Sequence, residues 1–145
     1  MRALLDINVL LALFDQDHVD HRTAQTFAGD RLGDGWATCP ITQNGFVRTI
    51  SQPRYPHPVM TTDALLRLAE ATADVSHEFW ADDASLTDPA VLDPTALLGP
   101  RQVTDAYLLA LAVRHGGRLV TFDTSVPLHA VVGATREHLE VLTGP

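Results

Sequence analysis

The segment that most constrains the fold runs from residue 103 to residue 123. Residues 103–112 are apolar almost all round, which predicts a buried helix, because a surface helix would carry one polar face. Two glycines end that helix, and residues 118–122 predict a buried strand that closes on Asp123. Asp105 lies in the first helical turn, where an acid suits the helix dipole. Carboxylates on buried elements are costly, so we expect a cap, an arginine or a metal ion to compensate them.

Short apolar runs alternate with helical patterns along the rest of the chain. Further strands are predicted at residues 3–5, 36–39, 78–80 and 139–142, and further helices at 8–14, 22–27, 41–50 and 61–75. Loops are predicted at 29–35 and 51–58, and the acidic, proline-broken segment 82–100 carries one helical turn near 89–92. Strands separated by helices predict a mainly parallel sheet covered on both faces, which is an α/β fold.

Length and cysteine content favour one domain in a reducing compartment. The 145 residues suit a single domain, residues 1–145. Cys39 is the one cysteine, so no internal disulfide forms, and we expect a cytoplasmic protein. The apolar run at residues 3–14 is too short to span a membrane and is interrupted by Asp6 and Asn8. We therefore expect neither a signal peptide nor a transmembrane helix.

The charged residues exclude several kinds of chemistry. All ten basic residues are arginine, so the chain has no lysine for a P-loop, a Schiff base or a lysine general base. The formal net charge of −8 opposes general attraction to nucleic acid. A nucleic-acid substrate would therefore need local arginines or bound cations to reverse the field near the site.

Three acids stand where a site of an open α/β sheet is expected. Asp6 and Asp123 each follow a predicted strand, and ligands bind beyond the carboxyl ends of such strands. Asp105 begins the helix that leads into the second of these strands, so it should face the same edge. Any one of these acids alone fits a cap or a surface charge better. The three together favour a site for a divalent cation, and oxygen ligands favour Mg²⁺ or Mn²⁺.

Four segments stand out along the chain, in the order Leu5–Leu10, Thr42–Arg48, Thr104–Leu108 and Thr121–Asp123. Together they resemble segments of PIN-domain ribonucleases, and most of all those of the VapC toxins of bacterial toxin–antitoxin pairs. The resemblance implies a PIN-like three-layer α/β/α sandwich and an endoribonuclease that depends on Mg²⁺ or Mn²⁺. It also implies a VapB-type antitoxin partner and a homodimer.

The resemblance also assigns roles to residues. Asp6, Asp105 and Asp123 match the metal-binding acids, and Asn8, Thr121 and Thr104 match polar residues that support them. The second acid of the family falls at Gln43, where an amide can accept a hydrogen bond or ligate a cation but adds no charge. From the sequence alone, we expect Gln43→Glu to lower the metal concentration needed for cleavage.

The remaining candidates concern RNA and the partner. Arg48 lies on the same predicted helix as Gln43 and could equally contact an RNA phosphate or form an ion pair with an acid. Arg54 and Arg101 are weaker candidates for RNA contact. An antitoxin helix could cover residues 9–14, although core packing accounts for most of these side chains. His18 and His21, among aspartates, form a weak candidate for a zinc or nickel site.

Two other classes of protein compete with the nuclease. The first is a catalytically weakened PIN-like module that binds RNA or protein without cutting, which the missing acid at Gln43 would explain. The second is a receiver or an aspartate-nucleophile phosphatase. Those proteins usually need a lysine near their acids, and this chain has none.

Overall fold

The computed structural model describes residues 1–144, which form five α-helices and five short strands. The strands are β1 (Ala3–Leu5), β2 (Trp36–Thr38), β3 (His77–Phe79), β4 (Arg118–Thr121) and β5 (Leu139–Val141). The helices are α1 (Ile7–Phe14), α2 (His21–Arg31), α3 (Pro40–Ile50), α4 (Thr61–Thr72) and α5 (Val103–Arg114). No helix among the described residues is both long and apolar enough to cross a bilayer.

The strands form one parallel sheet in the order β3-β2-β1-β4-β5. The central strand β1 pairs with β4 in a register that sets Leu5 beside Val120. The carboxyl ends of β1 and β4 therefore lie next to each other, and the residues that follow them emerge at one edge of the sheet. The predicted α/β class with a mainly parallel sheet is confirmed.

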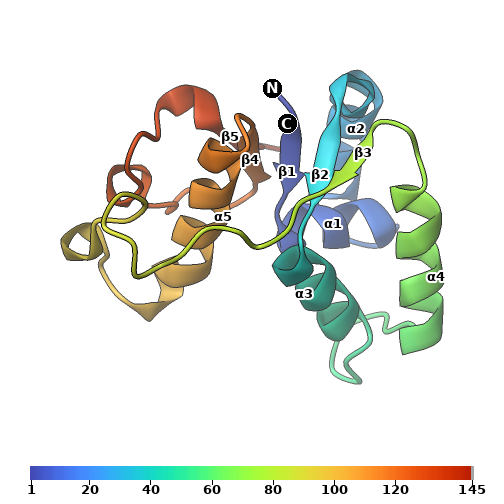
Figure 1. The fold of residues 1–145 in the computed structure, drawn as a ribbon. Coiled ribbons are helices and arrows are strands. Elements are labelled where there is room, and N and C mark those ends of the chain that lie inside the picture. The colour runs from blue at the N-terminus through green and yellow to red at the C-terminus, as the bar shows by residue number, and fades with distance from the viewer. Residues whose placement is uncertain (145) are drawn as a thin grey trace.

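Helices cover both faces of the sheet and create two hydrophobic cores. Leu4 and Leu119 face α5 in one core, whereas Leu5 and Val120 belong to the other core with residues of α1, α3 and α4. Successive strand residues point to opposite faces, which explains this division. Figure 1 shows α5 on one side of the strands and α1 to α4 on the other, which is the three-layer sandwich.

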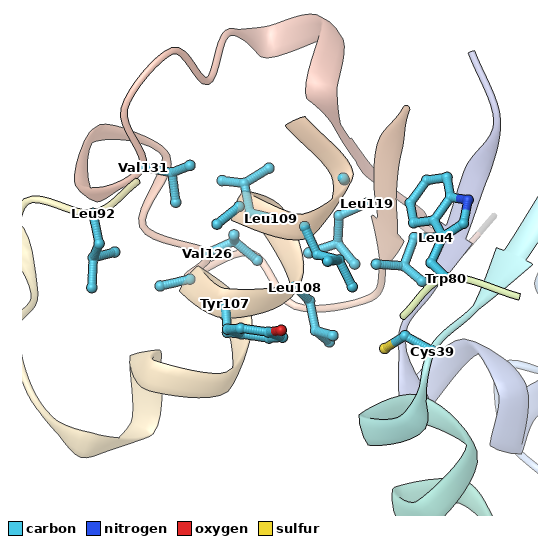
Figure 2. Packing of buried hydrophobic residues seen from close by; sticks show 14 of the residues in the cluster. Leu4, Cys39, Trp80, Leu92, Tyr107, Leu108, Leu109, Leu119, Val126 and Val131 are labelled. Atoms are coloured by element: carbon cyan, nitrogen blue, oxygen red, sulfur yellow. The ribbon is translucent and has the colours of Figure 1, made fainter. Parts of the chain in front are cut away.

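Helix α5 is the most deeply buried element of the first core. Residues 106–112 are all buried, as their apolar sequence predicts. Figure 2 shows Leu108 and Leu109 of this helix among Leu119, Val126 and other core side chains. Gly116, with a φ of 65°, turns the chain after the helix, a conformation that suits glycine. The chain then enters β4, which ends two residues before Asp123.

Two helix boundaries differ from the sequence-based prediction. Helix α2 continues through Gly29 to Arg31, where a loop had been expected, because Ala24 and Phe27 anchor it in the core. A glycine inside a helix costs only about 1 kcal/mol, which this packing offsets. Helix α4 ends at Thr72, three residues earlier than expected.

The single helical turn predicted near residues 89–92 is present, because the Asp88 carbonyl accepts from the amides of Val91 and Leu92.

We predict that Gly117→Ala destabilises the fold. A Cβ at residue 117 would lie 2.5 Å from the Arg2 carbonyl oxygen and 2.7 Å from the Trp80 ring. Overpacking of this kind costs about 1–3 kcal/mol of unfolding free energy, which urea titration followed by circular dichroism measures. Gly33→Ala is the control, because its Cβ would meet no atom within 4 Å. Equal stability of the two variants would contradict the close packing of residue 117.

Candidate functional site

Asp6 begins the site at the carboxyl end of β1. It is also the N-cap of α1, where its Oδ1 accepts a hydrogen bond from the Ile7 amide at 2.7 Å. Its Oδ2 accepts from the Thr121 hydroxyl at 2.6 Å. The residue is only 6% exposed, and burial raises the pKa of its carboxyl although both hydrogen bonds act to lower it. Asp6 is therefore a fixed, desolvated carboxylate.

The Thr121 hydroxyl connects the two strand ends. Besides donating to Asp6, it accepts from the Asn8 amide nitrogen at 3.2 Å and from the Asp123 backbone N–H at 3.0 Å. The Asn8 carbonyl oxygen accepts in turn from the Phe122 N–H at 3.2 Å. Asn8 and Thr121 therefore fix the chain between β4 and Asp123 relative to Asp6.

Asp105 and Asp123 complete the group of acids. Burial, the negative charges of Asp6 and Asp123, and a side-chain hydrogen bond with Asp123 together raise the pKa of Asp105 to about 7. The Asp123 Oδ1 accepts from the Ser125 N–H at 2.7 Å and from the Ser125 hydroxyl at 2.6 Å, and these bonds lower the pKa of its carboxyl. The three acids therefore interact electrostatically, and the pKa of Asp105 is the one raised to about 7.

The donors of this group fit a hard divalent cation. Every donor is a carboxylate oxygen. Burial first, and the neighbouring negative charges second, raise the pKa values of Asp6 and Asp105, and a cation would offset both effects. Within residues 1–144, the three acids do not bring three oxygens within 4.8 Å of one another. The site is therefore open, which suits Mg²⁺, because that ion keeps several of its water ligands.

Comparison with known proteins agrees with this arrangement. The sequence matches the PIN domain family over residues 3–131. Ribonuclease VapC44 of Mycobacterium tuberculosis is 58% identical over 142 residues, which cover 98% of this chain and 100% of that protein. This chain belongs to the PIN-domain family, in its VapC group. Ribonuclease VapC39 of the same organism is 46% identical over 135 residues, covering 92% of this chain and 96% of the relative.

A solved structure shares the fold of this PIN domain. VapBC2 from Rickettsia felis, bound to a DNA fragment from its promoter, superposes with a TM-score of 0.64. The match covers 99% of this chain and 100% of the other, at 12% sequence identity. This likeness supports the fold alone, because so low an identity carries no residue roles.

Gln43 of this PIN domain is hydrogen-bonded to the last residue of β2. Its amide nitrogen donates to the Thr38 hydroxyl at 2.9 Å, and Thr38 Oγ1 lies 2.8 Å from His77 Nε2. The residue lines a groove between α3 and α4, together with Val47 and Leu65. This hydrogen bond uses the amide nitrogen, so the carbonyl oxygen of Gln43 is the atom that could ligate a cation.

The remaining predicted residues lie around the site. Thr104 is exposed on the first turn of α5 and borders a cavity that Arg48 also lines. Arg54 and Arg101 are exposed on the 51–58 loop and on the turn before α5. No carboxylate of residues 1–144 lies within 4.0 Å of the guanidinium of Arg48, Arg54 or Arg101, so the ion pair expected as an alternative for Arg48 is absent from that range.

The histidines predicted as a weak metal site take other roles. His18 Nδ1 accepts from the Asp20 amide, and His21 Nδ1 lies 2.7 Å from the Ala12 carbonyl oxygen. A different histidine, His57, lies with Asp15 and Asp17 so that three ligand atoms fall within 4.8 Å of one another. The Asp15 Oδ2 of this group is already bonded to the Tyr55 hydroxyl at 2.6 Å.

The sequence-based reasoning missed Asp82. Burial raises the pKa of its carboxyl, whereas the nearby Cys39 thiol and Tyr107 hydroxyl act to lower it. In Figure 2 the Tyr107 hydroxyl and the Cys39 sulfur point toward the same space at the lower edge of the core. Asp82 follows β3 by three residues, so the pattern that singled out Asp6 and Asp123 could have found it.

We predict that Asp105→Asn makes the metal-free protein more stable near neutral pH. The folded pKa of about 7 exceeds the unfolded value of 3.8, so ionisation of Asp105 opposes folding. The contribution of the neutral Asp105 carboxyl to the free energy of unfolding is complete below about pH 4 and is lost as the pH rises through about 7. Asp105→Asn should not lose stability over this pH range. Each kcal/mol that it gains in unfolding free energy should raise Tm by about 2–4 °C.

Thermal unfolding in EDTA between pH 4 and pH 8 measures this difference. Asp30→Asn, at an exposed position of α2, is the control and should follow the wild-type curve. A wild-type Tm that stays constant between pH 5 and pH 8 would contradict the charge repulsion within the site.

Proposed function

We propose that this PIN domain is a metal-dependent endoribonuclease that acts as the toxin of a VapBC-type pair. The observation that carries the proposal is the meeting of Asp6, Asp105 and Asp123 at one edge of the sheet, with the pKa of Asp105 raised to about 7. Relatives named ribonuclease VapC, at 58% and 46% identity, support the activity. Oxygen donors favour Mg²⁺, with Mn²⁺ as the alternative.

The residues of the chain divide the work of such a site. A bound cation would neutralise the phosphate and make a water molecule more nucleophilic, so no protein nucleophile is needed. Thr121 and Ser125 hold oxygens of Asp6 and Asp123, so these carboxylates meet the cation without reorganisation. Without a cation the pKa of the Asp105 carboxyl is raised to about 7, and a bound cation would favour its ionised form.

Exposed arginines would bring RNA to this acidic protein. The formal net charge is −8, so local positive groups must counter the general repulsion of phosphate. Arg48 is placed best, because it borders the cavity that Thr104 also lines, beside the acids. Arg54 and Arg101 are further candidates for phosphate contacts.

We propose a VapB-type antitoxin as the partner, because the similar Rickettsia felis structure is a VapBC2 complex. The sequence-based placement of its helix on residues 9–14 stays a prediction. Residues 9–12 are buried, and Leu13 and Phe14 are only partly exposed. The groove between α3 and α4, of about 740 Å³, is lined in part by Val47, Leu65 and Leu68 and is a second candidate surface for that helix. A homodimer, a cytoplasmic location and a single domain over residues 1–145 stay predictions.

The competing function is a PIN-like module that binds RNA or protein without cutting. The observation in its favour is Gln43, which adds no charge and is bonded to Thr38. Incubating labelled RNA with the protein in Mg²⁺, Mn²⁺ or EDTA separates the two functions. Metal-dependent cleavage is expected, and RNA binding without cleavage in all three conditions would favour the binding module.

We predict that Asp6→Asn, Asp105→Asn and Asp123→Asn each fold and each lose most of the cleavage. The loss should be at least about 100-fold, the upper end of what removal of an outer-shell partner costs. Initial cleavage rates in Mg²⁺ measure it, circular dichroism checks the fold, and Asp30→Asn is the control at an exposed position. Full activity of Asp6→Asn would refute the site.

The contacts of Gln43 support a different expectation for Gln43→Glu from the one that the sequence alone suggests. Because residue 43 faces Thr38 and α4, the variant should need the same Mg²⁺ concentration for half-maximal cleavage as the wild type. A glutamate cannot donate to Thr38, so the unfolding free energy should fall by about 1 kcal/mol. Metal titrations and urea unfolding measure the two effects. A lower metal requirement would place the side chain of residue 43 at the cation.

A further inference from the structure

We propose that a cavity beside the acids binds one unpaired RNA base and selects guanine through Asp82. The inference rests on the proposed nuclease function and names the substrate of that site more closely. The cavity has a volume of about 430 Å³, and Ile7, Ile41, Asn44, Arg48, Asp82 and Thr104 are among the residues that line it.

The cavity adjoins the acids through two of its walls. Ile7 directly follows Asp6, and Thr104 directly precedes Asp105. A nucleotide in this cavity would therefore sit next to a phosphate held at the acids. The volume lies at the lower end of the roughly 300–1,000 Å³ typical of small-ligand pockets, which suits one unpaired nucleotide and excludes a base-paired helix.

The walls combine a rigid apolar floor with polar groups. A Cβ on Gly45 would overlap the Ile7 side chain, so Ile7 is pressed against α3 and presents a fixed surface to a flat base. Ile41 adds apolar area on the same side. Arg48, which is exposed, has the charge to hold a phosphate at the rim. Apolar walls with a few placed polar groups are typical of ligand pockets.

Asp82 supplies the chemistry that distinguishes the bases. Its carboxylate is among the groups that line the cavity, and it lies near the Cys39 thiol and the Tyr107 hydroxyl. An ionised carboxylate only accepts hydrogen bonds. The N1–H and N2–H₂ groups of guanine present two adjacent donors to it. Adenine and cytosine place a ring acceptor beside their amino group, and uracil places its N3–H between two carbonyl oxygens.

Asp82 stands apart from the group of acids that would hold the cation. Asp83 is the acid whose charge raises the pKa of Asp82, whereas Asp105 is affected by Asp6 and Asp123. Asp82 also comes from a different part of the chain. Figure 1 shows the segment after β3 crossing in front of the sheet toward the α5 side, and Asp82 lies at the start of this segment. These observations favour recognition of substrate over coordination of metal.

The experiment compares short single-stranded RNAs that differ at one position, with the full chain and Mg²⁺. In an RNA that the protein cuts, each guanosine near the cut is replaced in turn by inosine, which lacks only the N2 amino group. At one position we expect kcat/KM to fall by about 10–100-fold, the effect of losing a hydrogen bond to a charged group. Replacement by 7-deazaguanosine, which keeps the N1–H and N2–H₂ groups, should have no such effect.

Variants connect this preference to Asp82. Asp82→Asn should cut the guanosine and inosine RNAs at equal rates and bind Mn²⁺ with wild-type affinity by calorimetry. Asp83→Asn, the neighbouring acid, is the matched control and should keep the guanosine preference. Equal cutting by the wild type, a preference retained in Asp82→Asn, or weaker Mn²⁺ binding by Asp82→Asn would overturn the inference. Absence of metal-dependent cleavage of every RNA would instead refute the proposed nuclease function.

Discussion

The hydrogen bond from Thr121 to Asp6 is the interaction on which the site depends. It joins residues 115 positions apart, and it exists because β1 and β4 are neighbours in the sheet. The Thr121 hydroxyl uses its one donor and both acceptor positions, on Asp6, Asn8 and the Asp123 amide. A single saturated hydroxyl therefore fixes two acids and the start of α1 relative to one another.

This arrangement concentrates negative charge where the protein can least screen it. Asp6 is almost wholly buried, and Asp105 lies at the end of the most buried helix. A fold selected for stability alone would place apolar or paired groups there, because buried like charges raise the free energy of the folded state. Electrostatic strain that serves a ligand is the simplest physical reason for these acids.

The sequence predicted the fold well where local pattern and burial agree. The apolar runs of β1, β4 and α5 predict buried elements, and the acids at the ends of these elements were found for the same reason. The end of α2 was missed, because contacts of Phe27 with distant residues extend the helix past a glycine.

The helical position of Gln43 already indicates the direction of its side chain. Residues 43, 46 and 50 share one face of a helix, and Phe46 and Ile50 are buried in the core that includes α4. Gln43 therefore points toward that side of α3. The position of Asp82 three residues after β3 was a usable signal, but the path of the 81–100 segment that follows depends on long-range packing.

The crossing segment has a consequence for how proteins of this design can diverge. It leaves the sheet at the buried Trp80 and is tied again by the bridge between Leu92 and Val131. Between these two anchors its residues are mostly exposed and carry no strand or α-helix. Insertions or substitutions there can reshape one wall of the cavity without moving β1, β4 or α5. New substrate preferences can therefore arise in evolution while the hydrolytic machinery stays intact.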